Sequence, residues 1–345
     1  MRIHWRHLVG VGVALGAVVF WAIGLAVLQH TTEPTGADVF AENNTYWVRD
    51  LRMMALLVVA LGLLLALDGA RGAVRPIVAL GLLWLAADLA LDRADLAGAT
   101  TATVLAVVGC ALPLAVVPLL GRRLAPDRRQ AEPRTLLVIS TIAAVTAPLA
   151  AGMQSPTDTE PALTAGALTL GVLLVVAGVA AARAAAPPTA VARRWLGAGL
   201  LTVAGVAGVV LVRLVGIDAQ LVPTLALMTA LLVGGSLLAW DRPTGAADRV
   251  RRIGVLSVAV VGCPVLVMCL AVLLIFVVPV GGWLTALAGS PPVNAADSDT
   301  LHALVGLLAG LALSTLVRIS SGGQLVRSLP SSRGRGTPST ATQMP

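Results

Sequence analysis

Residues 253–279 read IGVLSVAVVGCPVLVMCLAVLLIFVVP, and no charged side chain interrupts them. A helix needs about 20 apolar residues to cross the roughly 30 Å hydrocarbon core of a bilayer. The run is therefore long enough to span a membrane. Arg249, Arg251 and Arg252 lie just before it. Because loops rich in positive charge stay on the cytoplasmic side, these arginines predict that the segment starts on that side.

Apolar segments of this kind recur along the whole chain of 345 residues. Hydrophobic residues make up 57% of it, charged residues make up 12%, and the mean hydropathy is +0.91, which excludes an ordinary soluble globular protein. We predict an all-α, polytopic helical membrane protein with about ten transmembrane helices, in one domain over residues 1–320. The predicted spans are residues 8–29, 51–68, 76–94, 101–120, 135–152, 161–182, 195–215, 221–240, 253–279 and 301–320. Residues 321–345 have the composition of a disordered tail.

The charged residues predict the orientation of these spans. Arginines gather in alternate connections, for example Arg122, Arg123 and Arg128, whereas the other connections are acidic. This pattern indicates a multi-pass protein of the plasma (inner) membrane with both termini in the cytoplasm. The first segment follows Arg2 and Arg6 as a secretory signal would, but its apolar run exceeds the about 7 to 15 residues of a signal sequence. We interpret it as a permanent helix.

Composition also excludes several kinds of chemistry. All 24 basic residues are arginine, so the lysine of a phosphate-binding loop or of a Schiff base is missing. Cys110, Cys263 and Cys269 lie inside predicted spans and lack the spacing of a zinc site. The longest connections are too short to fold as soluble domains. We expect no cofactor and no nucleic-acid partner; the partners we expect are the lipid bilayer, an unidentified small-molecule substrate and other membrane subunits.

Ten spans divide into two halves of five, which would be inserted with opposite orientations, as in the inverted repeats of many secondary transporters. The fourth span contains Gly109 and Pro113, and the ninth contains Gly262 and Pro264. Matched Gly/Pro interruptions in the two halves indicate a transport site between them. The sequence therefore predicts a ligand pathway at these four residues.

Three carboxylates follow one face of the third span, because Asp88, Asp92 and Asp95 are spaced by four and three residues. A carboxylate inside a span costs about 2.5 to 3.5 kcal/mol on insertion scales, so it should face protein or water. One hypothesis is a proton or cation pathway through Asp88 and Asp92. The alternative for Asp92 and Asp95 is a set of ion pairs with Arg49 and Arg52 at the start of the antiparallel second span.

Three further residues are candidates for this pathway or for a metal site. Arg213, near the outer end of the seventh span, either reaches Asp88 or Asp218 or extends to the membrane surface. His30 ends the first span and His302 begins the tenth, so both are expected at the outer side. Two imidazoles near outer carboxylates are ligands that zinc or copper accepts. Ordinary interfacial histidines are the alternative.

Three functions remain open. Ten short-looped helices with both ends inside resemble the architecture of the drug/metabolite transporter superfamily, which implies a secondary-transporter-like permease for a small solute or ion. The scarcity of polar and aromatic residues inside the spans instead favours a non-catalytic membrane subunit or scaffold. Asp38 and Glu42 resemble the acidic pair that C-type glycosyltransferases carry after their first helix, which implies a membrane-embedded transferase.

Overall fold

The computed structural model describes residues 5–32, 41–124, 132–153, 161–186, 191–216, 219–240, 245–289 and 301–325. Across these ranges the chain forms helices and no strand. The elements are α1 Trp5–Ile23, η1 Gly24–Leu28 (a π-helical turn), α2 Gln29–Thr31, α3 Ala41–Ala66, α4 Arg71–Arg93, α5 Ala99–Arg123, α6 Pro133–Gly152, α7 Pro161–Ala185, α8 Val191–Leu214, α9 Leu221–Ala239, α10 Ala246–Phe276, α11 Val280–Ala288 and α12 His302–Leu325.

Eight helical segments of the described chain are long and apolar enough to cross a membrane. They are Trp5–Thr31, Arg71–Arg93, Ala99–Arg123, Pro133–Gly152, Leu163–Ala185, Ala192–Leu214, Leu221–Ala239 and Ala246–Phe276. The chain is therefore a helical membrane protein. The two other predicted spans correspond to α3, whose described part carries Arg49, Asp50 and Arg52, and to α12, whose apolar part His302–Arg318 is shorter.

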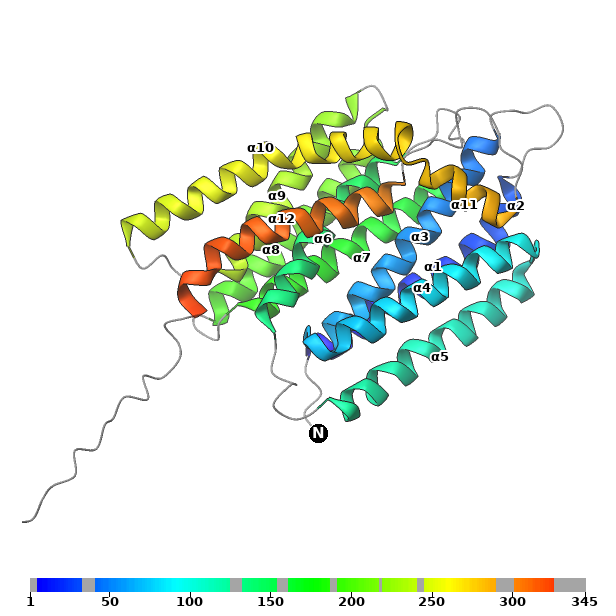
Figure 1. Ribbon diagram of the computed structural model, residues 1–345, viewed down its shortest axis with the longest axis horizontal. Coiled ribbons are helices and arrows are strands. Elements are labelled where there is room, and N and C mark those ends of the chain that lie inside the picture. The colour runs from blue at the N-terminus through cyan, green and yellow to red at the C-terminus, as the bar shows by residue number, and fades with distance from the viewer. Residues whose placement is uncertain are drawn as a thin grey trace, which may run out of the picture.

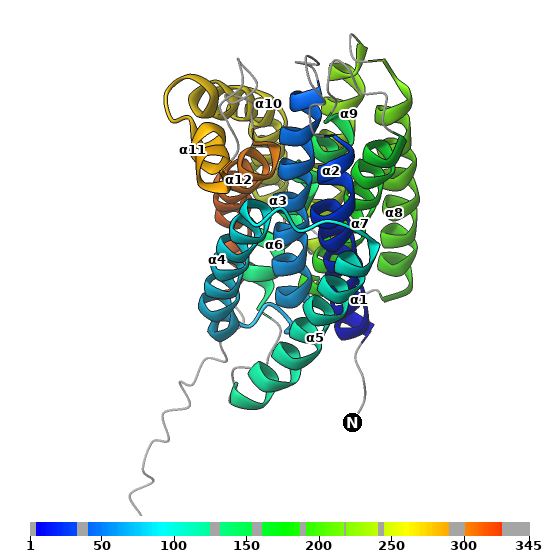
Figure 2. The same ribbon diagram turned by 90° about the vertical axis from the view of Figure 1, so that its right-hand side faces the viewer.

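The helices form one bundle in which they run roughly parallel and antiparallel to one another (Figure 1). The start of α1 and the end of α12 lie at the same end of the bundle, which we call the inner end. The outer end holds α2, α11 and the start of α12 (Figure 2).

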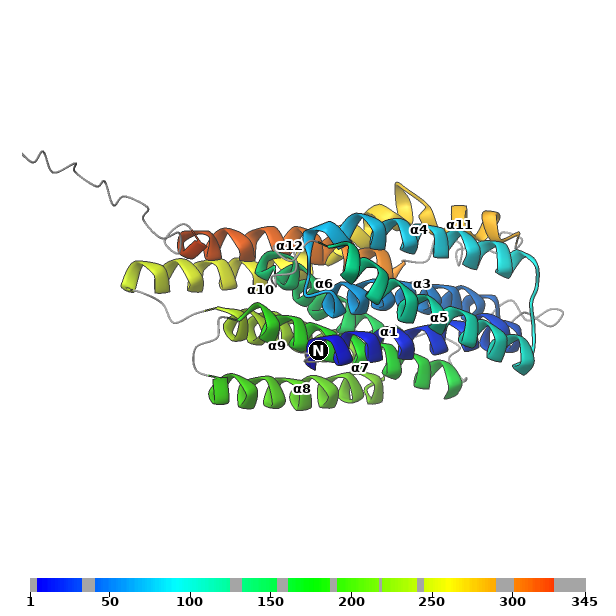
Figure 3. The ribbon, with the colours of Figure 1, turned by 90° about the horizontal axis from the view of Figure 1, so that it is seen from below.

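α6 occupies the centre of the bundle: 83% of its most apolar 18-residue segment is buried, whereas the corresponding share is 17% in both α4 and α5. It packs on α7, α9 and α12, while α1 packs on α3 and α5. Figure 3 shows α8 along one side and α4, α10 and α12 along the other, with α3, α6 and α7 between them. The peripheral helices turn large apolar side chains outward, as a bilayer solvent requires.

Two tight helix contacts depend on glycine. α1 and α3 meet at Gly10 and Gly62, where a Cβ atom on Gly62 would lie 2.8 Å from the Gly10 carbonyl oxygen. α6 and α12 meet at Gly306 and Gly310, where a Cβ atom on Gly310 would collide with the backbone of Ile142. Small residues spaced by four let membrane helices approach closely, and the resulting contacts hold α12 against the central helix.

The segment 280–300, predicted as an outer loop, begins with the short helix α11. Its nine residues are too few to cross a bilayer, so α11 lies at the outer end and packs on α4. α10 also begins earlier than predicted, at Ala246 rather than residue 253. The added turns carry Asp248, which bonds Arg251 and Arg252 along one helix face at 3.0 and 2.8 Å.

Candidate functional site

Arg52 of α3 lies fully buried between two carboxylates of α4. Its Nε donates to Asp88 Oδ1 and its Nη2 to Asp88 Oδ2, both at 3.0 Å. Nη2 also donates to Asp92 Oδ2 at 2.7 Å. Neither Arg52 nor Asp88 has exposed side-chain surface, and the Asp92 side chain is 6% exposed. The fork of the guanidinium matches the carboxylate of Asp88 in two parallel, charge-assisted hydrogen bonds.

Arg49, one helical turn before Arg52, completes this group of charges. Its Nε donates to Asp92 Oδ2 at 3.0 Å, and its Nη1 donates to the hydroxyl of Thr285 in α11 at 3.1 Å. We call Arg49, Arg52, Asp88 and Asp92 the ion cluster. Its two guanidinium groups balance its two carboxylates, so the cluster is neutral as a whole. It joins α3 to α4 and α11 near the outer end.

The first helix supplies the remaining partners of the ion cluster. Trp21 Nε1 donates to Asp88 Oδ1 at 2.8 Å, and Arg52 Nη1 donates to Gln29 Oε1 at 2.6 Å. The π-helical turn between these two residues widens the helix beside Arg52, and a Cβ on Gly24 would lie 3.0 Å from Arg52 Cγ. The wide turn, together with glycine, leaves room for the arginine side chain.

The structure thus brings together two of the carboxylates predicted on one face of the third span. Asp92 meets Arg49 and Arg52, as in the ion-pair alternative, whereas the pairing of Asp88 with Arg52 was not expected from the sequence. Asp95 lies apart from those arginines: its side chain is 79% exposed, and its carboxylate lies 3.4 Å from Nδ1 of His30. A pathway for ions through Asp88 and Asp92 remains a prediction, and it would have to open these bonds first.

Asp50 has a structural role that the sequence did not suggest. Its carboxylate accepts hydrogen bonds from the backbone N–H groups of His302 and Ala303, at 2.7 and 3.1 Å. It also lies 2.9 Å from Nδ1 of His302. The first N–H groups of a helix have no partner within the helix, and negative charge is favourable there. Asp50 therefore caps α12 from another helix.

Replacing Asp50 with alanine is expected to lower the melting temperature by about 1 to 3 °C, because a lost cap costs about 0.5 to 2 kcal/mol. Asp50→Asn keeps one acceptor oxygen and should cost less. The fraction of protein that stays monodisperse after a series of heating steps measures both effects. Equal losses for the two variants would contradict a capping role.

Arg213 does not reach Asp88. It donates to the backbone carbonyl of Met153 and, at 2.8 Å, to the hydroxyl of Thr164, and it lies 5.0 Å from the centre of the Trp47 ring. These contacts join α8 to α6, α7 and α3. Arg213 is 8% exposed, so it is buried between helices instead of extending to the membrane surface.

The two candidate metal ligands, His30 and His302, contact different residues. His302 binds Asp50, whereas His30 lies 3.1 Å from the carbonyl oxygen of Leu96. In the described part of the chain, no group of three or more His, Cys, Asp or Glu side chains could hold a metal ion. The outer carboxylates predicted near the histidines, Glu33, Asp297 and Asp299, lie outside that part.

The Gly/Pro interruptions of the fourth and ninth spans are not brought together. α5 and α10 lie on opposite sides of the bundle (Figure 1). Gly109 of α5 packs against α1, where an added Cβ would lie 2.7 Å from Val18. Pro113, also in α5, is buried. Gly262 has open space around it, and Pro264 is half-buried. No shared site between the two interruptions is formed.

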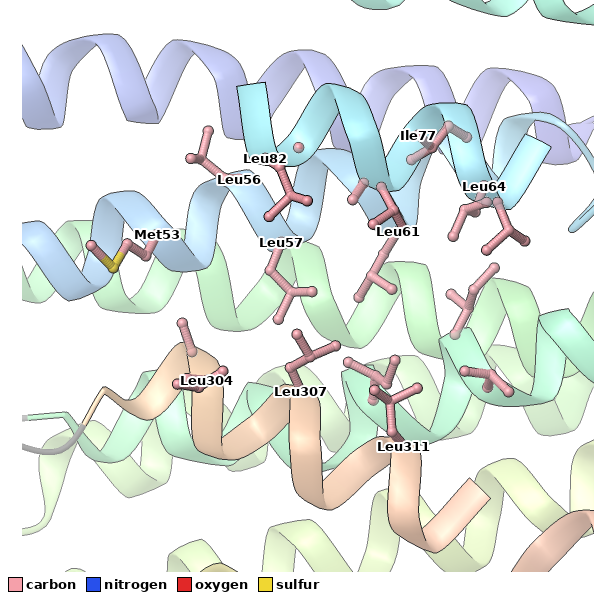
Figure 4. Close-up of a pocket in the computed structure, with 18 of the residues that line it drawn as sticks. Met53, Leu56, Leu57, Leu61, Leu64, Ile77, Leu82, Leu304, Leu307 and Leu311 are labelled. Atoms are coloured by element: carbon pink, nitrogen blue, oxygen red, sulfur yellow. The ribbon is translucent and has the colours of Figure 1, made fainter. Parts of the chain in front are cut away.

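A long apolar groove runs beside the ion cluster. It has a volume of about 850 Å³ and is bounded by α3, α4, α6 and α12, with α11 at its outer end. Figure 4 shows the side chains of Leu57, Leu61, Leu304, Leu307 and Leu311 converging on it. Among the described residues, α12 packs on α6 and α3, whereas α4 is not among the helices against which it packs closely. The groove occupies the space between α4 and α12.

The polar side chains that line the groove all lie toward its inner end. They are Arg71 at the start of α4, Arg134 and Thr135 at the start of α6, and Arg318 near the end of α12. Arg71 bonds Glu132 at 3.0 Å, and the Arg71 side chain is 64% exposed. Along α12, the groove lining extends from Arg318 to Leu301, the residue just before the helix. At 1.5 Å per residue, these two residues lie roughly 25 Å apart.

Sequence reasoning missed the groove because its lining looks like any membrane helix. Leu304, Leu307 and Leu311 have helical spacing, but apolar residues cover the other faces of α12 as well. Only the separation of α4 from α12 makes the groove. The convergence of Arg71, Arg134 and Arg318 from distant parts of the chain could be seen only after folding.

Comparisons with known proteins add no family. No family model matches the sequence, and no curated protein and no solved structure is significantly similar to it. The groove and the ion cluster are therefore the features from which a function can be inferred. The acidic pair of the transferase hypothesis, Asp38 and the side chain of Glu42, lies outside the described residues.

Proposed function

We propose that this protein is a permease that takes an amphipathic molecule into the groove between α4 and α12. The observation that carries the proposal is the groove itself: its volume of about 850 Å³ lies toward the upper end of the about 300 to 1,000 Å³ typical of ligand pockets. Its lining is apolar over most of its length. Such a surface suits a hydrocarbon chain better than a small polar solute.

The orientation belongs to the same proposal. Counting α3 and α12 as crossings gives ten spans, and both ends of the chain then lie on the cytoplasmic side of the plasma membrane. The arginines at the inner end support this orientation. In it, the groove extends from the cytoplasmic surface across most of the hydrocarbon core of about 30 Å. A repeat of two five-helix halves remains a prediction.

Gly81 of α4 offers a test of the groove. It lines the groove, and a Cβ atom on it would meet nothing within 4 Å. Gly81→Trp should therefore fill the groove without disturbing the helix contacts. Gly262→Trp is the matched control, because Gly262 has the same open surroundings but lies on α10, away from the groove.

The first measurement is extraction in native lipid discs, followed by mass spectrometry of the molecules that leave with the protein. An amphiphile bound to the wild type and to Gly262→Trp, but lost from Gly81→Trp, is the expected result. Equal retention by all three proteins would contradict the groove as the binding site. A stoichiometric protein partner in place of the amphiphile would favour the membrane-subunit hypothesis.

Transport needs a second measurement. Liposomes carrying a lipid with a fluorescent headgroup are treated with dithionite, which destroys fluorescence only in the outer leaflet. We expect the wild type to expose inner-leaflet probe faster than Gly81→Trp does. Binding without any movement of probe would contradict the permease and leave a lipid-binding membrane protein.

A further inference from the structure

We propose that the molecule taken by the groove is a lipid with a phosphate headgroup, and that Arg71, Arg134 and Arg318 hold this phosphate at the inner end. The inference rests on the proposed function, since it names the class of substrate that the same groove binds. It also divides the groove into two parts: an apolar part for the hydrocarbon chain and a cationic inner end for the headgroup.

The three arginines come from three different helices. Arg71 begins α4, Arg134 follows the start of α6, and Arg318 lies near the end of α12, yet all of them line one groove. Beyond them and Thr135, the lining is apolar up to the outer end. A molecule that fills the groove must therefore be apolar along most of its length and polar at one end.

The charge at this end selects an anion. The described lining of the groove holds three guanidinium groups and no carboxylate, and Glu132, outside the lining, bonds Arg71 at 3.0 Å. Guanidinium groups bind phosphate in forked pairs of hydrogen bonds. A phosphate monoester offers three acceptor oxygens, whereas a carboxylate offers two, and three guanidinium groups supply donors for all of them.

The preference for positive charge on the cytoplasmic side accounts for arginine at an inner helix end, but not for three arginines around one apolar groove. Arg193 shows the difference. It is an exposed arginine near the inner start of α8, on the far side of the bundle from α4 and α12 (Figure 3). If only general attraction to anionic lipids mattered, Arg193 would contribute as much as the groove arginines do.

The test uses the purified, delipidated full chain and native mass spectrometry. The probes are phosphatidic acid, a diacylglycerol with the same acyl chains but no phosphate, and inorganic phosphate alone. The wild type should bind phosphatidic acid at least tenfold more tightly than diacylglycerol. The triple variant Arg71→Gln, Arg134→Gln, Arg318→Gln should lose this preference while still binding diacylglycerol, and Arg193→Gln should behave as the wild type.

The outcomes separate the two proposals. If Gly81→Trp lowers binding of both lipids but the triple variant keeps the preference for phosphatidic acid, the groove stands and the headgroup site is wrong. If Gly81→Trp changes neither lipid, the groove itself is wrong. Arginine-dependent binding of inorganic phosphate without any preference between the lipids would overturn a lipid substrate. The single variant Arg134→Gln, at an exposed position, repeats the comparison if the triple variant is not monodisperse.

Discussion

Replacing Arg52 with methionine is expected to destabilise the protein by about 3 to 5 kcal/mol, which corresponds to a fall of roughly 4 to 7 °C in melting temperature. The reason is the charge that remains. Asp88 is fully buried and Asp92 nearly so, and Arg52 bonds both of them. Without it, Arg49 alone must balance two carboxylates in a medium that solvates charge poorly.

The second half of this prediction concerns the double variant Arg52→Met, Asp88→Asn, which should recover most of the loss. Arg49 and Asp92 then remain as a neutral pair at 3.0 Å, and the asparagine can still accept the hydrogen bond from Trp21. Melting temperatures of the single and double variants in the same detergent measure the difference. Arg193→Met, at an exposed inner position, is the control and should leave the melting temperature unchanged.

A double variant no more stable than Arg52→Met would contradict an electrostatic origin of the effect. Asp88→Asn alone is informative for a different reason. It leaves two guanidinium groups against one carboxylate, so a moderate loss of stability is expected if Asp88 only holds the helices together. Unchanged stability with complete loss of transport would instead place Asp88 in an ion pathway.

Gly310→Leu is expected to cost at least about 3 kcal/mol, the upper part of the range for overpacked cores. Even the first carbon of a side chain at Gly310 would collide with the backbone of Ile142 in α6. Backbone of a central helix cannot move aside as the end of a flexible side chain can. The two helices would have to separate along the Gly306 and Gly310 contact, which would also displace the α12 wall of the groove.

Gly262→Leu is the matched control for this contact. It makes the same substitution on α10, a helix at the periphery of the bundle that packs on α12. An added Cβ there meets nothing within 4 Å, so the leucine points into lipid. We expect its melting temperature to equal that of the wild type within error. A similar loss for both variants would mean that leucine disturbs helix insertion itself and not the contact between α6 and α12.

The sequence suggested that Arg49 and Arg52 pair with Asp92 because these residues lie on consecutive antiparallel helices, but it did not suggest that Arg52 also binds Asp88. A short connection between the second and third spans leaves few ways to arrange Arg49, Arg52 and Asp92, so spacing along two helices was enough to suggest their pairing. The same reasoning failed for Asp95, because the chain leaves α4 at Asp95 in a left-handed backbone conformation, φ 54°, that turns it toward solvent and His30.

Contacts between distant segments could not be predicted in this way. The shared Gly/Pro interruptions of α5 and α10 suggested proximity, but nothing in an apolar sequence fixes which of many similar helices become neighbours. Lipid and protein surfaces are equally apolar here, so hydrophobic periodicity, which identifies the buried face of a soluble helix, carries little information. The groove and the capping of α12 by Asp50 both depend on which helices become neighbours, so neither could be predicted from the sequence.

The polar start of α3 has a consequence for how the protein is made. In the proposed ten-span arrangement, Arg49, Asp50 and Arg52 enter the membrane before any of their partners on α4, α11 or α12 has been synthesised. On its own, this segment inserts at a cost, because each such charge is unfavourable in hydrocarbon. α4 brings the carboxylates that neutralise the arginines, so these two helices are best inserted as a hairpin. Asp50 can form its hydrogen bonds only after α12 has been synthesised. These bonds then join α3 to α12 at the outer end of the bundle.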